Sequence, residues 1–223
     1  MLVVSVRGDQ FDERESERNQ LVEVAIRQRG VSDAAVLRAM RRVPRHVFVP
    51  SDVASYAYLD RPLSIGHGQT ISQPFIVAYM TEALELNDDE TVLEIGTGSA
   101  YQAAVLAEVT RKVYTIEIIA ELARSARDTL DSLGYDYVQS KLADGYFGWE
   151  EAAPFDAIIV TAAADHVPPS LIAQLAPGGV MIIPVGTPQG TQTLIRIRKR
   201  SNGLVDRDGL MYVRFVPFTR EKK

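Results

Sequence analysis

The first third of the chain spaces its hydrophobic residues mainly as helices do. Apolar positions three and four residues apart predict a helix over 13–29, a second one that Ser32 caps and Pro44 ends, and a third over 74–86. Residues 51–73 carry no such periodicity. Structureless stretches longer than about 15 residues are uncommon inside compact domains and are often functional. The pattern therefore predicts an N-terminal helical layer that includes a functional loop.

From residue 87 onward, short apolar strands alternate with amphipathic helices. The strands are expected at residues 91–95, 112–118, 137–142, 155–163 and 180–186. A parallel pair of strands needs a crossover connection, which is usually a helix. The alternation therefore predicts a parallel, doubly wound sheet.

The last part of the chain has no helix between its strands. TLIRIRKR and LMYVRFVPF alternate apolar and polar residues, which predicts antiparallel strands at an edge of the sheet. We interpret the basic run 196–200 as the solvated face of an edge strand, where charges discourage pairing between molecules. The expected fold is α/β, in one domain over residues 1–223. Its parts are N-terminal helices with an active-site loop (13–86), a ligand-binding core (87–190) and C-terminal edge strands (191–223).

Composition excludes several classes of protein. The 223 residues include 24 Lys and Arg against 29 Asp and Glu, a net charge of −5, which argues against a protein built mainly to grip nucleic acid. The absence of Cys excludes disulfides, thiol catalysis, zinc ribbons and iron–sulfur clusters. No apolar run reaches the length of a membrane span, and the apolar N-terminal stretch is too short for a signal peptide. We therefore expect a soluble, cytoplasmic protein.

A glycine-rich turn follows the first strand of the expected sheet. The sequence Glu94-Ile95-Gly96-Thr97-Gly98-Ser99 leads from strand to helix, and its glycines allow a tight turn and close approach of a ligand. A dinucleotide fingerprint needs a third glycine at position 101, where Tyr101 stands. An acidic residue just before the first glycine is instead typical of S-adenosylmethionine (AdoMet) enzymes. The alternative is a turn that only connects strand to helix.

Two further candidates lie at the ends of the next two strands. Glu117 stands where a doubly wound sheet places the carboxylate that accepts ribose hydroxyls. Asp144 and Gly145 follow the third strand on the same edge, where they can contact an adenine ring. A solvated glutamate and an Asp-Gly turn without a ligand remain the alternatives.

The aperiodic loop ends in the segment Gln69–Pro74. Within it, Ser72 is a plausible cap for the helix that begins at Pro74. No GxSxG motif makes this serine a hydrolase nucleophile. The histidines, which are His46, His67 and His166, show no metal-binding spacing, and we expect no metal.

Together these stretches make the chain resemble the protein-L-isoaspartate O-methyltransferase family. The matching segments, in order, are VPRHVFVP, PLSIGHGQTISQPFIVAYMTEAL, VLEIGTGSAYQAAVLA, APFDAIIVTAAADHVPPSLIAQLAPGGVMIIPVG and FVPFT. The second segment is the specific one, because general AdoMet folds do not carry IGxGQTISQP. Two features depart from the family pattern. Ala100 replaces a second glycine after GTGS, and residues 1–12, expected as a loose arm, have no counterpart.

The resemblance implies a Rossmann-like class I AdoMet-dependent methyltransferase. Such an enzyme transfers a methyl group from AdoMet to the free α-carboxylate of L-isoaspartyl residues in damaged proteins, and releases S-adenosylhomocysteine. The implied partners are isoaspartyl peptides and flexible protein segments, without nucleic acid or membrane, and the enzyme is expected to be a monomer.

The resemblance also implies roles for individual residues. Ser72 would be the active-site residue, Glu117 would hold the ribose, and Asp144 with Gly145 would hold the adenine. Gly96, Gly98 and Ser99 would surround the methionine moiety. The remaining expected cofactor contacts are Thr70, Ile71, Ser72, Glu94, Thr97, Ile118 and, from the tail, Thr219.

Three rival functions are weighed against this one. Another AdoMet methyltransferase could act on RNA or a small molecule, although the acidic composition and the TISQP segment count against RNA. An NAD-dependent dehydrogenase is disfavoured by Tyr101. A non-catalytic protein of the same fold would be expected to lose Gly96, Gly98 or Glu117, and all are present.

Overall fold

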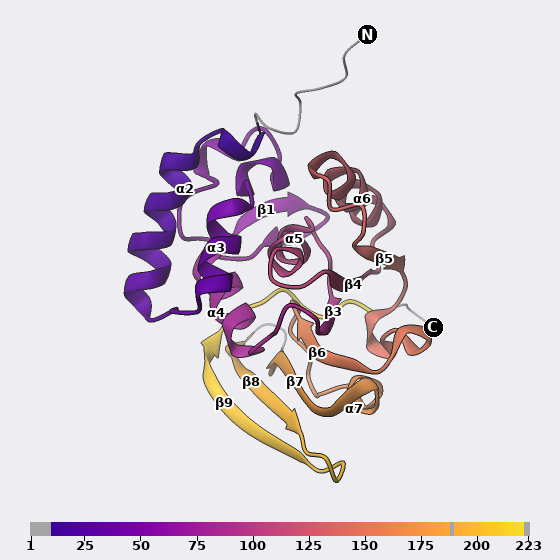
Figure 1. Cartoon of the computed structure of the whole chain (residues 1–223). Coiled ribbons are helices and arrows are strands. Elements are labelled where there is room, and N and C mark those ends of the chain that lie inside the picture. The colour runs from indigo at the N-terminus through magenta and orange to yellow at the C-terminus, as the bar shows by residue number, and fades with distance from the viewer. Residues whose placement is uncertain (1–9, 188–189, 221–223) are drawn as a thin grey trace.

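The computed structural model describes residues 10–187 and 190–220, so most of the loose arm expected over residues 1–12 lies outside the described part. Residues 10–12 are helical and Phe11 is buried in the core, so the expectation of a loose arm is wrong for these residues. Its centre is a sheet of β3 (Thr91–Ile95), β4 (Lys112–Glu117), β5 (Gln139–Leu142), β6 (Phe155–Val160), β7 (Leu175–Val185), β8 (Gln192–Lys199) and β9 (Val205–Val213). The seven strands are ordered β5-β4-β3-β6-β7-β8-β9 (Figure 1). Pairing is parallel from β5 to β7 and antiparallel from β7 to β9, which confirms the predicted sheet.

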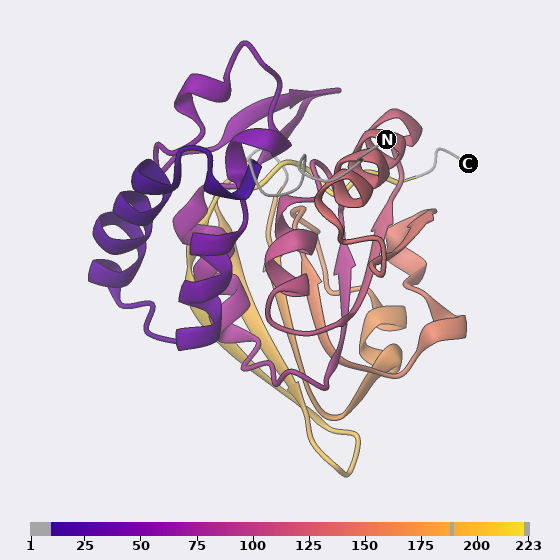
Figure 2. The same ribbon diagram turned by 45° about the horizontal axis from the view of Figure 1, so that its top comes forward.

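Helices cover the sheet on both faces. The helices are α2 (Glu15–Leu21), α3 (Ala34–Arg42), α4 (Pro74–Ala83), α5 (Tyr101–Ala107), α6 (Ala120–Leu133) and α7 (Pro169–Gln174). Apolar residues of α3, α4, α5 and α6 share one core cluster with sheet residues such as Val92, whereas Leu171 of α7 packs with Leu93 in a second cluster. In Figure 2 the indigo N-terminal helices and the orange helix α7 accordingly lie on opposite sides of the strands. None of the helices within the described ranges is long and apolar enough to span a membrane.

The N-terminal helical layer agrees with the sequence in extent but differs in detail. The helix expected over 13–29 is α2 followed by a π-helical turn (Val22–Ile26) and a 3₁₀ turn (Arg27–Arg29). Asp33, not Ser32, caps α3, because the Asp33 side chain accepts a hydrogen bond from the Val36 N–H at 2.8 Å. Ser32 is occupied elsewhere, since its backbone N–H donates to the Glu82 carboxylate of α4 at 2.6 Å.

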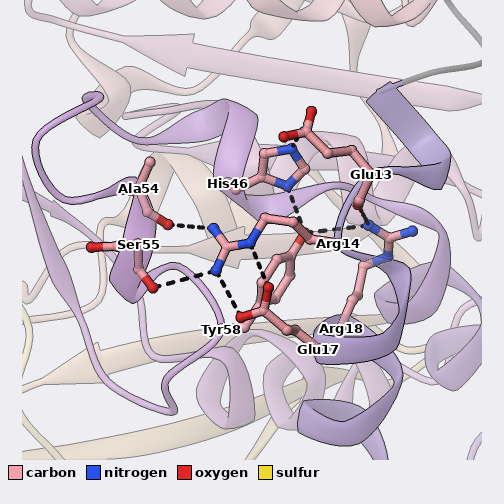
Figure 3. A network of polar contacts seen from close by, with 8 residues as sticks. All are labelled: Glu13, Arg14, Glu17, Arg18, His46, Ala54, Ser55 and Tyr58. Carbon is pink, nitrogen blue, oxygen red and sulfur yellow. Dashed lines mark hydrogen bonds and ion pairs between the residues drawn. The ribbon is translucent and has the colours of Figure 1, made fainter.

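A polar network ties this layer to the loop that follows it (Figure 3). Arg14 donates hydrogen bonds to the carbonyls of Ala54 and Ser55, at 2.6 and 3.3 Å. The Tyr58 hydroxyl contacts both Arg18, at 3.2 Å, and His46 Nδ1, at 2.7 Å. The network therefore fixes the start of the loop against α2.

The loop expected to be structureless over 51–73 contains a small hairpin, which corrects the prediction. Strands β1 (Leu63–Gly66) and β2 (Gln69–Ile71) pair antiparallel. Strands this short show too few alternating positions for a periodic pattern to be recognised. The turn between them is tight, with φ of +52° at His67 and +70° at Gly68.

The chain after β9 crosses the carboxyl edge of the sheet. In Figure 1 this yellow segment runs from β9 back across the molecule toward the C-terminal end. Midway it pairs beside β6, where Ala163 N–H donates to Val216 and Phe218 N–H donates to Ala163, both at 2.8 Å. We call residues 216–220 the C-terminal strap. Before it, β8 and β9 are joined by a solvent-exposed turn that contains Asn202 and Gly203, the latter with a φ of +84°.

Candidate active site

The glycine-rich turn between β3 and α5 leaves no room for side chains at its first glycine. Gly96 has a φ of +96°, and a Cβ built on it would lie 2.5 Å from Thr161 Oγ1. The Thr161 hydroxyl in turn donates a hydrogen bond to the Gly96 carbonyl at 2.7 Å. A ligand at this turn therefore meets bare backbone, and Thr161 fixes the position of that backbone.

Glu117 is held at the end of β4 by backbone N–H groups. Its Oε2 accepts from Gly98 at 2.8 Å, and its Oε1 accepts from Ile118 and Ile119, both at 2.9 Å. These bonds couple the carboxylate to the glycine-rich turn on the neighbouring strand. The side chain is thus preorganised at the edge where the sequence predicts the ribose.

Glu94 lies beneath the same turn and is fully buried. Thr115 donates to its Oε2 at 2.5 Å, and the Thr115 hydroxyl also contacts the Thr97 hydroxyl at 2.6 Å. Its Oε1 has no hydrogen-bond partner among the described residues. Burial raises the pKa of Glu94 to about 8, and the nearby negative charge of Glu117 adds to that rise against the hydrogen bond from Thr115. The site therefore contains a buried carboxyl group with one free acceptor.

Three adjoining cavities open around these groups. The central cavity encloses about 550 Å³, part of it open to solvent, and is lined by Gly96, Glu117, Ile118, Gly145 and Thr219 among others. The inner cavity, of about 320 Å³, includes Ile71, Glu94, Thr97, Gly98 and Ser99. The outer cavity, of about 1210 Å³, is lined by Arg29, Pro62, Tyr212, Arg214 and Phe215 among others. Thr70 and Thr161 line all of them, so the cavities meet at one point.

Ser72 lies where the inner and outer cavities meet, since it lines both. The interpretation of Ser72 as a helix cap is wrong, because Gln73 occupies the cap position of α4 and no side chain caps that helix. The Ser72 hydroxyl makes no hydrogen bond to any residue within the described ranges. It is therefore free to bind a ligand.

Asp144, the residue predicted to contact adenine, differs from the other candidates because its carboxylate is bonded to other residues of the chain. Gly145 lines the central cavity, but the Asp144 carboxylate is bonded to Arg220 Nε, at 2.8 and 3.1 Å, and to the Tyr146 N–H, at 3.0 Å. The Arg220 guanidinium also lies 3.6 Å above the centre of the Tyr146 ring. The C-terminal strap is thus fastened beside the glycine of this turn.

A comparison with protein families decides the wider relationship. The family model described as protein-L-isoaspartate(D-aspartate) O-methyltransferase (PCMT) matches residues 16–223. The chain belongs to this family. The family and the fold class that the sequence predicted are confirmed.

Individual members of the protein-L-isoaspartate O-methyltransferase family support this placement. A protein-L-isoaspartate O-methyltransferase of Opitutus terrae is 58% identical over 209 residues, which are 94% of this chain and 89% of that one. Protein-L-isoaspartate O-methyltransferase 1 of Nitrosospira multiformis is 56% identical over 207 residues, 92% of this chain and 88% of that one. A Plasmodium falciparum structure, described as a protein-L-isoaspartate O-methyltransferase in complex with S-adenosyl-L-homocysteine, has a TM-score of 0.78 at 26% identity. That similarity covers 92% of this chain and 99% of the other.

The residues present fit the cofactor of a methyltransferase. The turn at Gly96 has no space for a Cβ, and the free Oε1 of Glu94 is an acceptor suited to an ammonium group. The Glu117 carboxylate is fixed at the strand edge. Every residue that the sequence proposed for cofactor contact lines the central or the inner cavity, except Asp144.

Four residues that the sequence interpretation missed belong to this region. Thr161 follows β6 at the carboxyl edge, so the rule that ligands bind at that edge could have identified it. Thr115 is hidden in an apolar strand, and Arg45, which donates to the Ser72 carbonyl at 3.0 Å, and Arg220 act through tertiary contacts that no local pattern records. These residues are identified by their positions in the fold and not by a sequence motif.

Proposed function

We propose that this chain transfers a methyl group from AdoMet to the free α-carboxylate of an L-isoaspartyl residue, with Ser72 at the point of transfer. Membership of the protein-L-isoaspartate O-methyltransferase family supports the reaction. The observation that carries the assignment of Ser72 is its position on the wall shared by the inner and outer cavities. One cavity is then available for the donor and the other for the acceptor.

The residues around the central and inner cavities suit the parts of the donor. Glu117 would accept hydrogen bonds from ribose hydroxyls, and the adenine would lie beside Gly145. The free Oε1 of Glu94 would accept from the ammonium of the methionine moiety, while Gly96, Gly98 and Ser99 would contact that moiety through their backbone. Thr70, Ile71, Thr97, Ile118 and Thr219 would complete the walls.

The chemistry asks little of the protein beyond positioning. Bound AdoMet supplies an electrophilic methyl group on a positively charged sulfur. The acceptor carboxylate has a reference pKa of about 4, so it is ionised at neutral pH and needs no general base. Opposite charges approach each other during transfer, and a site that excludes water therefore favours the reaction. The Ser72 hydroxyl would hold the carboxylate by a hydrogen bond and would not itself attack.

The outer cavity is the proposed site for the damaged peptide. It lies beside the edge strand β9, and its walls come from Arg29 and Pro62, on the N-terminal side, and from residues 211–216. An extended peptide could pair with the backbone of β9, which would give low sequence selectivity. Protection of residues 205–216 from hydrogen exchange on addition of an isoaspartyl peptide would support this location, and unchanged exchange would contradict it.

The reaction is tested with two peptides that differ only in an isoaspartyl or an aspartyl linkage. We expect AdoMet-dependent, base-labile methylation of the isoaspartyl peptide alone. Methylation of both peptides would remove the specificity for the damaged linkage. No methylation of either peptide, with AdoMet still bound, would leave the fold assignment and redirect the search to the other acceptor classes.

Removal of the Ser72 hydroxyl tests its role. Ser72→Ala is expected to lower turnover by about 10²-fold, the scale of one lost oriented donor, and to leave AdoMet affinity unchanged. Turnover and AdoMet binding by calorimetry are the two measurements. A variant that loses AdoMet binding, or that keeps full turnover, would refute the proposed role.

The oligomeric state and the cellular location of the protein stay predictions. The enzyme is expected to be a monomer. Light scattering at micromolar concentration would test it. The cytoplasmic location expected from composition would be tested by cell fractionation.

A further inference from the structure

Arg45 is a charged side chain enclosed by protein on all sides. It begins the 3₁₀ turn Arg45–Phe48 and is 0% exposed. Its guanidinium donates hydrogen bonds to three backbone carbonyls, those of Ala57, Arg61 and Ser72, the last two at 3.2 and 3.0 Å. All the groups bonded to this cation are therefore parts of the chain just before and just after the β1–β2 hairpin.

The bonded carbonyls of Arg61 and Ser72 flank the β1–β2 hairpin on either side. Arg61 lies two residues before β1 begins at Leu63, and Ser72 directly follows the last residue of β2. A single planar fork thus holds both ends of the hairpin. Because Thr70 of that hairpin lines all three cavities, the fork also sets where the hairpin stands relative to them.

The positive charge of Arg45 is costly to bury. Burial lowers the pKa of Arg45, which reflects the cost of placing its charge away from water. Its Nε has no hydrogen-bond partner among the described residues. An apolar residue of similar size would avoid this cost but would leave the bonded carbonyls without a donor. What an apolar residue cannot reproduce is the fixed geometry of three bonded carbonyls.

We propose that Arg45 is a positioning residue for methyl transfer, whose guanidinium holds the Ser72 backbone so that the Ser72 hydroxyl stays at the junction of the inner and outer cavities. This inference rests on the proposed role of Ser72. Arg45 touches neither cavity itself and acts only through the residues that it holds. A displacement of a reacting or orienting group by about 1 Å can lower a rate by about 10²-fold, so a backbone anchor next to Ser72 has a measurable effect.

The variant R45K tests the fork without removing the charge. A lysine ammonium is a compact donor that cannot bridge carbonyls arranged around a planar guanidinium. We expect kcat with the isoaspartyl peptide to fall by about 10- to 100-fold. The Kd for S-adenosylhomocysteine is expected to rise by a smaller factor than kcat falls, because the hairpin supplies Thr70 and Ile71 to the cofactor walls, whereas Glu94 and Glu117 are not bonded to Arg45. R45M is the more severe variant, and R45K keeps the test valid if R45M does not fold.

Arg18 provides a matched control. It is also an almost fully buried arginine, 2% exposed, and it donates to the carbonyls of Phe11, Glu13 and Arg41 (Figure 3 includes Arg18 and Glu13). It also donates to the Tyr58 hydroxyl at the start of the loop, at 3.2 Å, but none of its bonded partners is Ser72 or lies in the hairpin 63–71. R18K is expected to lower the free energy of unfolding as R45K does, yet to keep kcat within about twofold of the wild type in the folded fraction. Equal losses of kcat in R45K and R18K would show a general structural effect and overturn the proposal.

A double-mutant cycle identifies the residue through which Arg45 acts. If Arg45 works through Ser72, R45K should cost less than about threefold further in kcat when S72A is already present. Full additivity of the two losses would overturn the proposal.

Hydrogen exchange gives a readout that needs no activity, and amides of residues 61–73 should exchange faster in R45K than in R18K. If the wild type transfers no methyl to the isoaspartyl peptide, the proposed function fails, and the Arg45 proposal fails with it. If the wild type and S72A behave as expected and R45K keeps full kcat, only the Arg45 proposal fails.

Discussion

Glu94 shows how a single residue can couple the site to pH. Burial, more than any neighbouring charge, raises its pKa to about 8. The carboxyl group is therefore largely protonated near neutral pH, although it stands next to the turn where an ammonium group is expected. Binding of that ammonium would favour the ionised form, so we expect cofactor binding to release a proton.

The same shift predicts a pH-dependent stability. In the unfolded chain Glu94 ionises near its ordinary value of 4.5, whereas in the folded chain it keeps its proton up to about pH 8. The folded state binds the extra proton between these values, so stability is highest below the lower pKa and falls as pH rises toward the upper one. The fall is about 1.4 kcal/mol per pH unit from this group. Urea unfolding of the cofactor-free protein at pH 5.5, 6.5 and 7.5 would measure it. Glu94→Gln should flatten the profile, and parallel profiles for the two proteins would contradict the assignment.

At the scale of elements, the C-terminal strap joins the two edges of the sheet. It leaves the edge strand β9, pairs with Ala163 after β6, and ends at the Asp144 carboxylate after the opposite edge strand β5. Val216 lines both the central and the outer cavity, and residues 217–219 line the central one. The strap is thus a wall of both sites and is held at its end by one ion pair.

Loss of the Arg220–Asp144 ion pair should make the C-terminal strap, which lines the central cavity, more mobile. In Arg220→Ala, the S-adenosylhomocysteine dissociation rate is expected to rise about tenfold, because a hydrogen bond between charged groups contributes about 1.5–3 kcal/mol. Stopped-flow displacement would measure the rate. Arg200→Ala is the control, since Arg200 bonds Asp206 at 2.6 Å beside the exposed β8–β9 turn and not at the site. Equal rates in the wild type and Arg220→Ala would show that the strap is not fastened by this contact.

The sequence predicted regular elements better than short or tertiary ones. The five core strands were located by apolar runs, although β7 begins at Leu175 rather than at Val180. The β1–β2 hairpin was missed because strands of three and four residues give no periodic signal. Most of the strap was predicted as part of an edge strand because it continues the segment LMYVRFVPF, and its pairing with Ala163 depends on contacts distant in sequence. Motif spacing thus located the glycine-rich turn and Glu117, but not Thr161, Arg45 or Arg220.

At the scale of the whole molecule, the N-terminal layer and the sheet share one core. Val22 and Met40 belong to the same buried cluster as Val92, Ile182 and Val213. The layer therefore shares most of its buried apolar side chains with the sheet, apart from a small cluster of Leu21, Ala57 and Tyr58. The single domain expected from the chain length and from the lack of a linker stays a prediction.

A single domain should unfold as one unit. Trp149, the only tryptophan of the chain, packs against the second core cluster, on the α7 side of the sheet. Its fluorescence and the far-ultraviolet circular dichroism should report the same unfolding midpoint in urea, because coincident probes indicate a two-state transition. An earlier loss of circular dichroism would show that the N-terminal layer unfolds by itself.

The exposed turn between β8 and β9 contains a site where asparagine deamidation is expected during storage of the purified protein. Asn202 is followed by Gly203, which has no side chain to hinder attack on the asparagine, and both residues are exposed; the Gly203 N–H donates only to the Arg200 carbonyl of the same turn, at 2.9 Å. Attack of such an amide on the asparagine side chain begins deamidation and leaves isoaspartate. Both Asn202 and Asp144 accept a hydrogen bond from the backbone N–H two residues on, but Asp144 is also buried and bonded to Arg220, so the Asp144–Gly145 pair is better protected. Stored enzyme should therefore accumulate its own methyl acceptor at position 202, and methyl incorporation without added peptide would record the age of a preparation.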